Sequence, residues 1–354
     1  MIRILGSLLL LSLLGACSHF QEPPPKKVPT RDEIRLETAI YRADADLART
    51  ALQNGVDPNG SMRNGIPFLI AAATRQNPVL VEILLENGAN AKMTDETGET
   101  PLHAAVGSSK TNVTRMLLRN GADPNARGRC GRTPLMEAVR LGKIENVKLL
   151  LENGASCLLE DEFGRNVISY AALAPENGKE ILELFVGKKE PLMPRSSELE
   201  KSPLLSAMLN GQPETVDYLL RLVPSYKEPE QQALGQAAIR IAIDRNRLDW
   251  VKILVERGVE LNKTLPLAFR AARLINVDGV YKFLARNNVI DRGYTPLMWA
   301  AIRSRPEIAE YLVLQGSDVN ALSNEGENAL DYANDTATRS AIRSASRQAR
   351  KLQK

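Results

Sequence analysis

Aromatic and histidine side chains are scarce in this sequence of 354 residues. Phe, Trp and Tyr together make up 5% of it, and His19 and His103 are its two histidines. So few aromatic side chains disfavour an aromatic-lined cofactor pocket or a base-stacking platform and favour a core of small aliphatic residues. A mechanism that needs two histidines in one folded domain is also disfavoured, because His19 lies in a predicted linker.

The sequence also lacks a large net charge of either sign. Its 46 Lys and Arg exceed its 42 Asp and Glu by four, which is too little to indicate a nucleic-acid partner. With 44% apolar and 25% charged residues and a mean hydropathy of -0.23, the composition indicates a globular protein. Its length exceeds what one core usually organises, so we expect either two domains or a repeat architecture.

Long hydrophobic runs are absent except at the N-terminus, where an apolar run over residues 4–14 follows Arg3. It is about half of the roughly 20 residues that a membrane-spanning helix needs, so it indicates a signal peptide over residues 1–16. The run ends in Leu14-Gly15-Ala16-Cys17. These four residues resemble the lipobox of bacterial lipoproteins, which implies cleavage before Cys17 and a covalent lipid on it. An ordinary signal peptide cleaved near Ala16 is the alternative.

The lipoprotein resemblance also implies a location. Ser18 stands where retention in the inner membrane of Gram-negative bacteria requires Asp, so we expect a lipid anchor in the outer membrane, with the folded part in the periplasm. Residues 17–32 contain three consecutive prolines, a composition that favours extended polyproline geometry. We interpret this segment as a tether between the lipid and the folded part.

The rest of the sequence repeats with a period of about 33 residues. Hexads of the type Thr-Pro-Leu-X-X-Ala recur at residues 100–105, 133–138 and 295–300, with weaker copies at 66–71, 166–169, 202–205, 265–267 and 328–331. In each hexad Thr caps a helix and Pro occupies its first turn. A second apolar segment of helical spacing follows and ends at Gly, as in Asn-Gly-Ala at residues 87–89 and 120–122.

This pattern resembles the ankyrin repeat, in which a hairpin-like finger precedes two antiparallel helices. The resemblance implies an all-α ankyrin-repeat solenoid over residues 33–335, with about nine units after a half-unit at 33–60. It also implies a basic capping helix over residues 336–354. The polar stretch 187–201 is a possible break, so two blocks hinged there are the alternative. The repeat register between residues 166 and 290 stays open.

The resemblance implies structural roles for the residues at the helix starts, which are Thr100, His103, Thr133 and Thr295. A metal site is not expected, because Cys130, Cys157 and His103 offer no zinc-ligand spacing. The two cysteines fall on neighbouring fingers, and two independent thiols are favoured over a disulfide. We expect no cofactor other than the lipid.

Catalysis is not expected either, since the sequence contains no Gly-x-Ser-x-Gly, Walker-type or His-Glu-x-x-His motif. A carboxylate-based hydrolase of cell-wall glycan would depend on Glu160, Asp161 and Glu162. We favour a solvated acidic loop for these three residues, because nothing apolar nearby would raise a carboxyl pKa.

The predicted function is therefore a non-enzymatic interaction scaffold that binds an envelope or secreted protein. It would act as a partner chaperone, in support of an enzyme, or as an immunity-type protein. Arg, Tyr and Trp are enriched at binding hot spots. The candidate contacts on fingers and inner helices are Arg127, Arg129, Arg132, Arg140, Glu162, Phe163, Arg292, Tyr294, Trp299 and Arg303. The alternative is that Trp299 packs between helices and that the arginines are solvated.

One alternative is a structural envelope component that contacts peptidoglycan or a membrane surface. Arg339, Arg343, Arg347 and Lys351 recur every four residues and form a basic stripe on the predicted last helix. Such a stripe would suit a membrane surface or another polyanion, whereas a solvated face of a capping helix is the simpler interpretation.

Overall fold

The computed structural model describes residues 28–186, 202–223, 225–227, 229–264 and 293–352. Within these ranges every regular element is a helix. The backbone pairs as in a β-sheet at one place, an isolated β-bridge between Ser61 and Pro67. The all-α class predicted from the repeats is confirmed. The fingers between the helix pairs are turns without a strand ladder.

Contacts divide the described residues into two compact units. Unit 1 holds residues 28–137, 149–156 and 160–163, and unit 2 holds residues 138–148, 157–159 and the described residues from 164 onward. The boundary passes through α7 (Pro134–Arg140) and α8 (Ile144–Glu152). The possible break at 187–201 lies outside the described residues.

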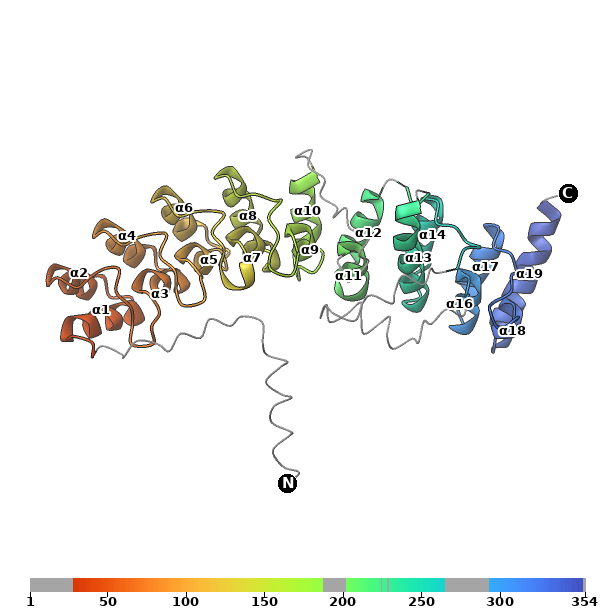
Figure 1. The fold of residues 1–354 in the computed structure, drawn as a ribbon, viewed down its shortest axis with the longest axis horizontal. Helices are drawn as coiled ribbons and strands as arrows, with labels where there is room; N and C mark the ends of the chain where they lie inside the picture. Colours follow the sequence, from red (N-terminus) through yellow and green to blue (C-terminus); the bar gives the residue numbers. More distant parts are fainter. Residues whose placement is uncertain (1–27, 187–201, 224, 228, 265–292, 353–354) are drawn as a thin grey trace, which may run out of the picture. The chain divides into compact units, whose positions relative to one another are not determined.

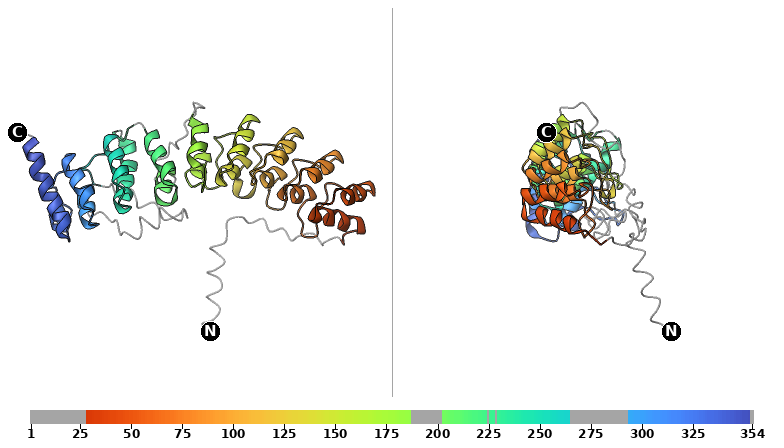
Figure 2. Two further views of the ribbon diagram at one scale, coloured as in Figure 1. Left: turned by 180° about the vertical axis from the view of Figure 1, so that it is seen from behind. Right: turned by 90° about the vertical axis from the view of Figure 1, so that its left-hand side faces the viewer.

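Helix pairs in sequence order make up each unit (Figures 1 and 2). Unit 1 contains α1 (Arg31–Arg42), α2 (Ala45–Gln53), α3 (Phe68–Thr74), α4 (Pro78–Glu86), α5 (Pro101–Ala105), α6 (Asn112–Arg119) and the 3-10 turn η1 (Arg129–Gly131). Unit 2 contains α9 (Val167–Ala171), α10 (Gly178–Val186), α11 (Pro203–Asn210), α12 (Pro213–Leu222), α13 (Pro229–Asp244), α14 (Leu248–Glu256), α16 (Pro296–Ile302), α17 (Pro306–Leu314), α18 (Ala329–Tyr332) and α19 (Thr336–Leu352).

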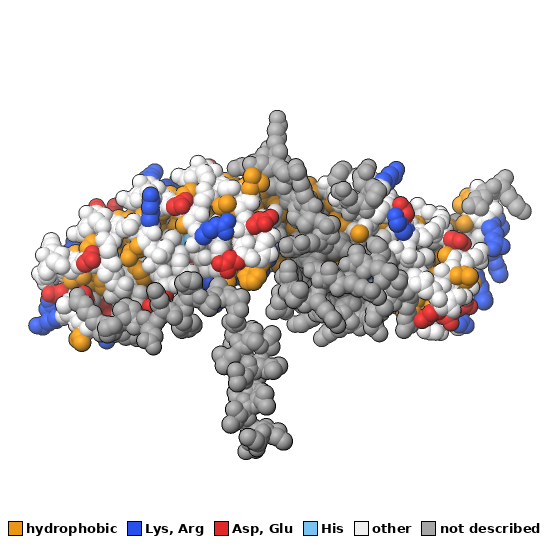
Figure 3. All heavy atoms as spheres, in the orientation of Figure 1, with side chains coloured by type: hydrophobic (Ala, Val, Ile, Leu, Met, Phe, Trp, Pro, Cys, Tyr) orange, Lys and Arg blue, Asp and Glu red, His pale blue; other side chains and the backbone are white. Residues whose placement is uncertain are grey.

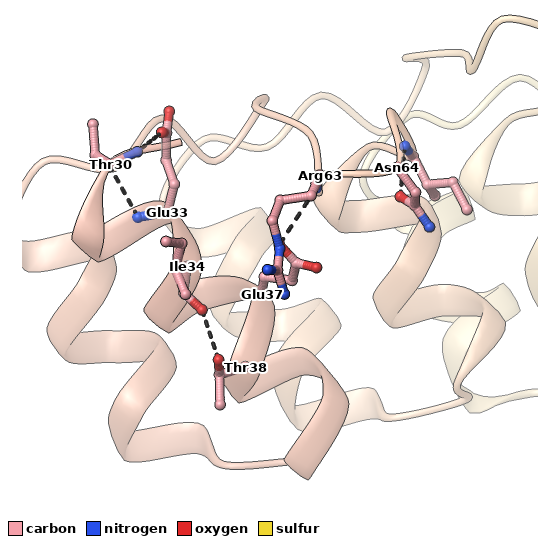
Figure 4. A network of polar contacts seen from close by, with 8 residues as sticks. Thr30, Glu33, Ile34, Glu37, Thr38, Arg63 and Asn64 are labelled. Atoms are coloured by element: carbon pink, nitrogen blue, oxygen red, sulfur yellow. Dashed lines mark hydrogen bonds and ion pairs between the residues drawn. The ribbon is translucent and has the colours of Figure 1, made fainter. Parts of the chain in front are cut away.

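The first pair is complete, although the sequence predicted a half-unit at 33–60. Thr30 Oγ1 accepts from Glu33 N at 3.2 Å while Thr30 N donates to the Glu33 carboxylate at 2.6 Å, which is a capping box that starts α1 (Figure 4). Asp44 caps α2 in turn by accepting from Leu47 N at 3.0 Å. Both caps precede the first recognisable hexad, which explains why the period did not reveal the full pair.

A buried carboxylate joins this first pair to the next finger. Glu37 on α1 is 6% exposed and accepts from Arg63 Nε at 3.1 Å and from Arg63 N at 3.4 Å (Figure 4). Because the ion pair is also hydrogen-bonded to the backbone, it fixes the position of the finger and not only that of a side chain.

Side-chain amides join successive repeats in the same way at several places. Asn59 Nδ2 donates to Gly88 O at 3.2 Å, and Asn59 Oδ1 accepts from Asn90 N at 2.7 Å. We call this two-bond contact an amide bracket. It recurs from Asn125 to Gly154 and Ser156, from Gln232 to Gly258 and Glu260, and from Asn262 to Gly316 and Asp318. Each bracket gives a donor to the carbonyl of the glycine that follows a helix.

The bracket of Asn262 shows which helix pairs are neighbours in unit 2. Asn59 reaches 29 residues along the sequence to Gly88, whereas Asn262 reaches 54 residues to Gly316. In agreement with this, α13 contacts α16 and α14 contacts α17. The described pair α13/α14 thus packs directly on α16/α17, and the weak repeat copy at 265–267 lies outside the described residues.

Small aliphatic side chains fill the space between the helices. Ala39, Ala51, Ala72 and Ala105 are all fully buried, and so are Leu36, Leu102 and Leu117. Alanine at these positions lets the helices approach closely, and this accounts for the low aromatic content of the sequence.

Candidate functional site

Thr100 and His103 hold the start of α5. Thr100 Oγ1 lies 2.8 Å from His103 Nδ1, and Thr100 N donates to the same nitrogen at 3.2 Å. His103 Nε2 lies 3.0 Å from the Arg132 carbonyl oxygen, which can only accept, so Nε2 carries the hydrogen and Nδ1 is an acceptor. Both side chains are buried, at 4% and 3% exposure. These contacts stabilise the start of α5 and its packing on the next finger.

Thr133 and Thr295 begin their helices with methionine in the place of histidine. The sulfur atoms of Met136 and Met298 each accept from the threonine N–H at 3.5 Å. Methionine therefore keeps the acceptor at the helix start but supplies no donor for the neighbouring finger. The absence of a side chain at Gly128 makes room for His103, because a Cβ there would lie 2.9 Å from His103 Nε2.

Residues 127–132 and 160–163, which we call the finger pair, bring several predicted contact residues together in unit 1. Glu162 N donates to Cys130 O at 3.0 Å, and Arg127 Nη1 donates to Glu160 O at 3.0 Å. A Cβ on Gly131 would lie 3.2 Å from both Arg127 Nη1 and Glu162 Cγ. The finger pair is thus held by one hydrogen bond between backbone groups and by one from the Arg127 side chain to a backbone oxygen.

The predicted contact residues differ in exposure. Arg127, Arg129 and Arg140 are exposed, and so is Phe163 at 47%. The Arg129 guanidinium has no hydrogen bond or ion pair with any described residue. Arg132 differs from the expectation, since it is half-buried with Nε 3.7 Å from the Glu137 carboxylate, and it stabilises the local fold.

The acidic finger residues are not equivalent. Glu160 and Glu162 are exposed, as predicted, but Asp161 is 5% exposed and its Oδ1 accepts from Phe163 N at 2.9 Å, so it forms the turn itself. Cys130 and Cys157, the finger cysteines, are thiols not joined by a disulfide, and Cys157 is buried. Among the described residues no group of histidine, cysteine and carboxylate side chains could hold a metal ion.

The second predicted cluster lies in unit 2, and there Trp299 differs from its expected place on the surface. It is 7% exposed because α13 packs on α16 and carries Arg240, whose guanidinium lies 3.9 Å from the centre of the indole ring. Arg303 lies 5.0 Å from the same centre. Tyr294 is half-buried, with its ring 6.0 Å from that of Trp299, and Arg292 lies outside the described residues.

The charges around Trp299 are unevenly matched. Arg303 Nε binds the Asp244 carboxylate, whose side chain is 8% exposed, and Arg305 Nη2 donates to the Asp244 main-chain oxygen at 3.2 Å. Burial raises the pKa of the Asp244 carboxyl, and Arg303 opposes that shift. Burial lowers the pKa of the Arg240 guanidinium to about 10, against the charge of Asp244, so Arg240 stays cationic at neutral pH. Sequence reasoning missed both Arg240 and Asp244.

The basic stripe predicted for the last helix is present on α19. Thr338, Ile342 and Ala345 face α17 and are buried, whereas Arg343, Arg347 and the other basic side chains of the helix are exposed. Figure 3 shows Lys and Arg side chains gathered along this helix. The helix carries no acidic residue, so its exposed face is uniformly positive.

Comparison with known proteins agrees with this architecture. A family model described as ankyrin repeats (3 copies) matches residues 36–128, 69–161, 168–264 and 268–342. The chain belongs to the ankyrin-repeat family. It is also 31% identical over 108 residues to neurogenic locus notch homolog protein 2 of Homo sapiens and of Mus musculus, a match that covers 28% of this chain and 4% of either relative.

The predicted membrane anchor is not described by the structure, because Cys17 lies outside the described residues. Among the helices of the described ranges, none combines the length and the apolar character that crossing a bilayer requires.

Proposed function

We propose that this protein is a lipid-anchored periplasmic scaffold that binds another protein of the envelope, or a secreted one, without enzymatic activity. Ankyrin repeats indicate a protein partner in general. The anchor rests on the lipobox-like residues that end in Cys17, and the outer-membrane location rests on Ser18. Two or three acyl groups would hold the protein at the bilayer, since each buried CH₂ contributes about 0.8 kcal/mol.

The finger pair is the observation that carries the binding proposal. It presents two exposed guanidinium groups, on Arg127 and Arg129, and an aromatic ring on Phe163 that is 47% exposed. Arginine and aromatic side chains dominate the energetics of protein interfaces when a partner desolvates them. The hydrogen bonds of the finger pair fix its backbone and the Arg127 side chain before binding, which lowers the entropic cost of association.

Affinity purification from detergent-solubilised envelopes, followed by mass spectrometry, tests the scaffold. We expect the tagged protein to recover a stoichiometric protein partner, and Arg127→Glu with Arg129→Glu to abolish its recovery. Arg115→Glu with Arg119→Glu is the matched control, because these two exposed residues lie on α6 and the charge change is identical. Recovery of glycan alone, or equal loss of the partner in both variants, would contradict the role of the finger pair.

The anchor is tested separately. Cys17→Ala should remove incorporation of a labelled fatty acid and release the protein from the membrane fraction. If wild-type protein carries no label, or if the variant keeps it, lipidation at Cys17 is wrong, and the scaffold proposal then has to stand without an anchor.

A further inference from the structure

Arg240 is a buried cation that shares its nearest described carboxylate, that of Asp244, with Arg303. Its side chain is 6% exposed, and its Nε has no hydrogen-bond partner among the described residues. The nearby carboxylate of Asp244 attracts Arg240, but its Oδ1 is bound by Arg303, and no ion pair joins Arg240 to a described acid. Stacking on Trp299 offsets part of the cost of burial, but it satisfies no N–H donor.

Positive charges outnumber negative charges among the described residues around Trp299. Among the described residues, Arg240, Arg303 and Arg305 supply three positive charges to one from Asp244, and of these three only Arg240 is buried. A buried charge that lacks a partner is costly, because the low local dielectric offers no substitute for water. The surplus of cationic donors therefore favours a group that only accepts hydrogen bonds and carries negative charge, which is a carboxylate.

The space beside Arg240 sets the size of that group. A cavity of about 10 Å³ lies between α13 and the start of α16, and it is lined by Gln236, Ile239, Arg240, Tyr294, Thr295 and Trp299. This is room for roughly one water-sized atom group. A whole ligand does not fit, but one oxygen of a carboxylate does, with the rest of the ligand outside.

We propose that this cluster is an acid-binding pocket, which receives a carboxylate of the protein partner and pairs it with Arg240. The inference rests on the proposed function, since a partner must deliver the group. The carboxylate comes from an Asp or Glu side group or from the free carboxyl end of the partner's polypeptide, and the two sources share this chemistry. Burial in the bound state strengthens the ion pair, because Arg240 is already desolvated by α16.

Fluorescence of Trp299 in the purified full-length protein tests the pocket, with Trp250→Phe removing the other tryptophan. The probes are three glycine-rich pentapeptides. One has blocked ends and a central Glu, one has blocked ends and a central Gln, and one has only glycine and a free C-terminus. We expect a saturable change of emission with the Glu peptide or with the free C-terminus, and none with the Gln peptide. The peptide that responds identifies the source of the carboxylate.

Arg240→Gln should weaken this binding by about tenfold or more, as expected for the loss of a charge-assisted hydrogen bond. Arg247→Gln is the matched control, because Arg247 stacks on residue 250 in the same way but is paired with Asp249. If Arg240→Gln does not fold, Arg240→Lys should still respond to the same peptide, since it keeps the charge. The pocket is wrong if the Gln peptide gives an equal response, if neither acid gives one, or if Arg247→Gln weakens binding as much.

These measurements need no partner, so their failure is distinguishable from failure of the affinity purification. A partner recovered through the finger pair without acid binding at Arg240 would overturn the pocket alone. Acid binding without a recovered partner would leave the pocket intact and contradict the scaffold.

Discussion

Replacing His103 by alanine and by methionine separates the two contacts of its ring. Both variants lose the Nε2–H bond to the Arg132 carbonyl, but that oxygen keeps Gly128 N as a donor at 2.8 Å. The loss therefore costs about 1 kcal/mol, the usual net value of a hydrogen bond, and not the larger penalty of an orphaned group.

The variants differ at the helix start. Methionine can accept from Thr100 N, as Met136 and Met298 do for their threonines at 3.5 Å. Alanine leaves this buried N–H without the His103 ring, which costs about 1–3 kcal/mol, and it also removes buried volume. We expect destabilisation of about 1 kcal/mol for His103→Met and about 3 kcal/mol for His103→Ala.

Urea unfolding followed by far-UV circular dichroism measures both values, provided the slope with denaturant stays constant. Equal destabilisation by the two variants would refute the acceptor role of Nδ1. A cost below 1 kcal/mol for His103→Ala would refute the whole account, because the buried polar contacts would then contribute nothing.

Three further outcomes follow from the geometry. Asn125→Ala should lower stability by about 2 kcal/mol, since it removes an amide bracket of two bonds, whereas Asn112→Ala, on the exposed face of α6, should change urea stability little. With the full-length protein anchored in vesicles, trypsin should cut α19 more slowly on anionic than on neutral lipid, and Arg343→Gln with Arg347→Gln should reduce this protection by roughly 30-fold; equal rates on both lipids would exclude a membrane contact. Cys130 should react promptly with a thiol reagent in the native protein, and Cys157 only after unfolding, so equal reaction rates of the two thiols would contradict their difference in exposure.

The sequence was sufficient for the local structure of the repeats. Threonine followed by proline marks the starts of α5, α7 and α16, because the cap and the missing N–H act within one turn. Glycine marks the ends: Gly88 has a φ of +90°, and a Cβ there would meet nothing within 4 Å, so its conformation and not its space requires glycine.

The contacts between repeats were harder to predict, because the residue that makes a given contact can stand at different positions in different repeats. Asn59 and Asn125 make their brackets from finger turns, but Gln232 makes the same contact from helix α13. A side-chain amide makes the contact in each case, but it stands at a different position of the repeat. A search for the finger motif therefore misses it.

Trp299 and Arg240 are buried at the same interface between repeats, which the sequence alone did not indicate. In a stack of repeats the adjacent repeat decides whether a side chain is buried, and a period of about 33 residues places that neighbour about 33 residues away. Arg303, one turn after Trp299, binds Asp244, which lies 59 residues earlier in the sequence. The sequence leaves the surface and the helix interface open for Trp299 and does not single out Arg240, because it does not show that α13 packs on α16. Once that neighbour is known, the burial of the indole and the burial of the guanidinium follow from the same interface.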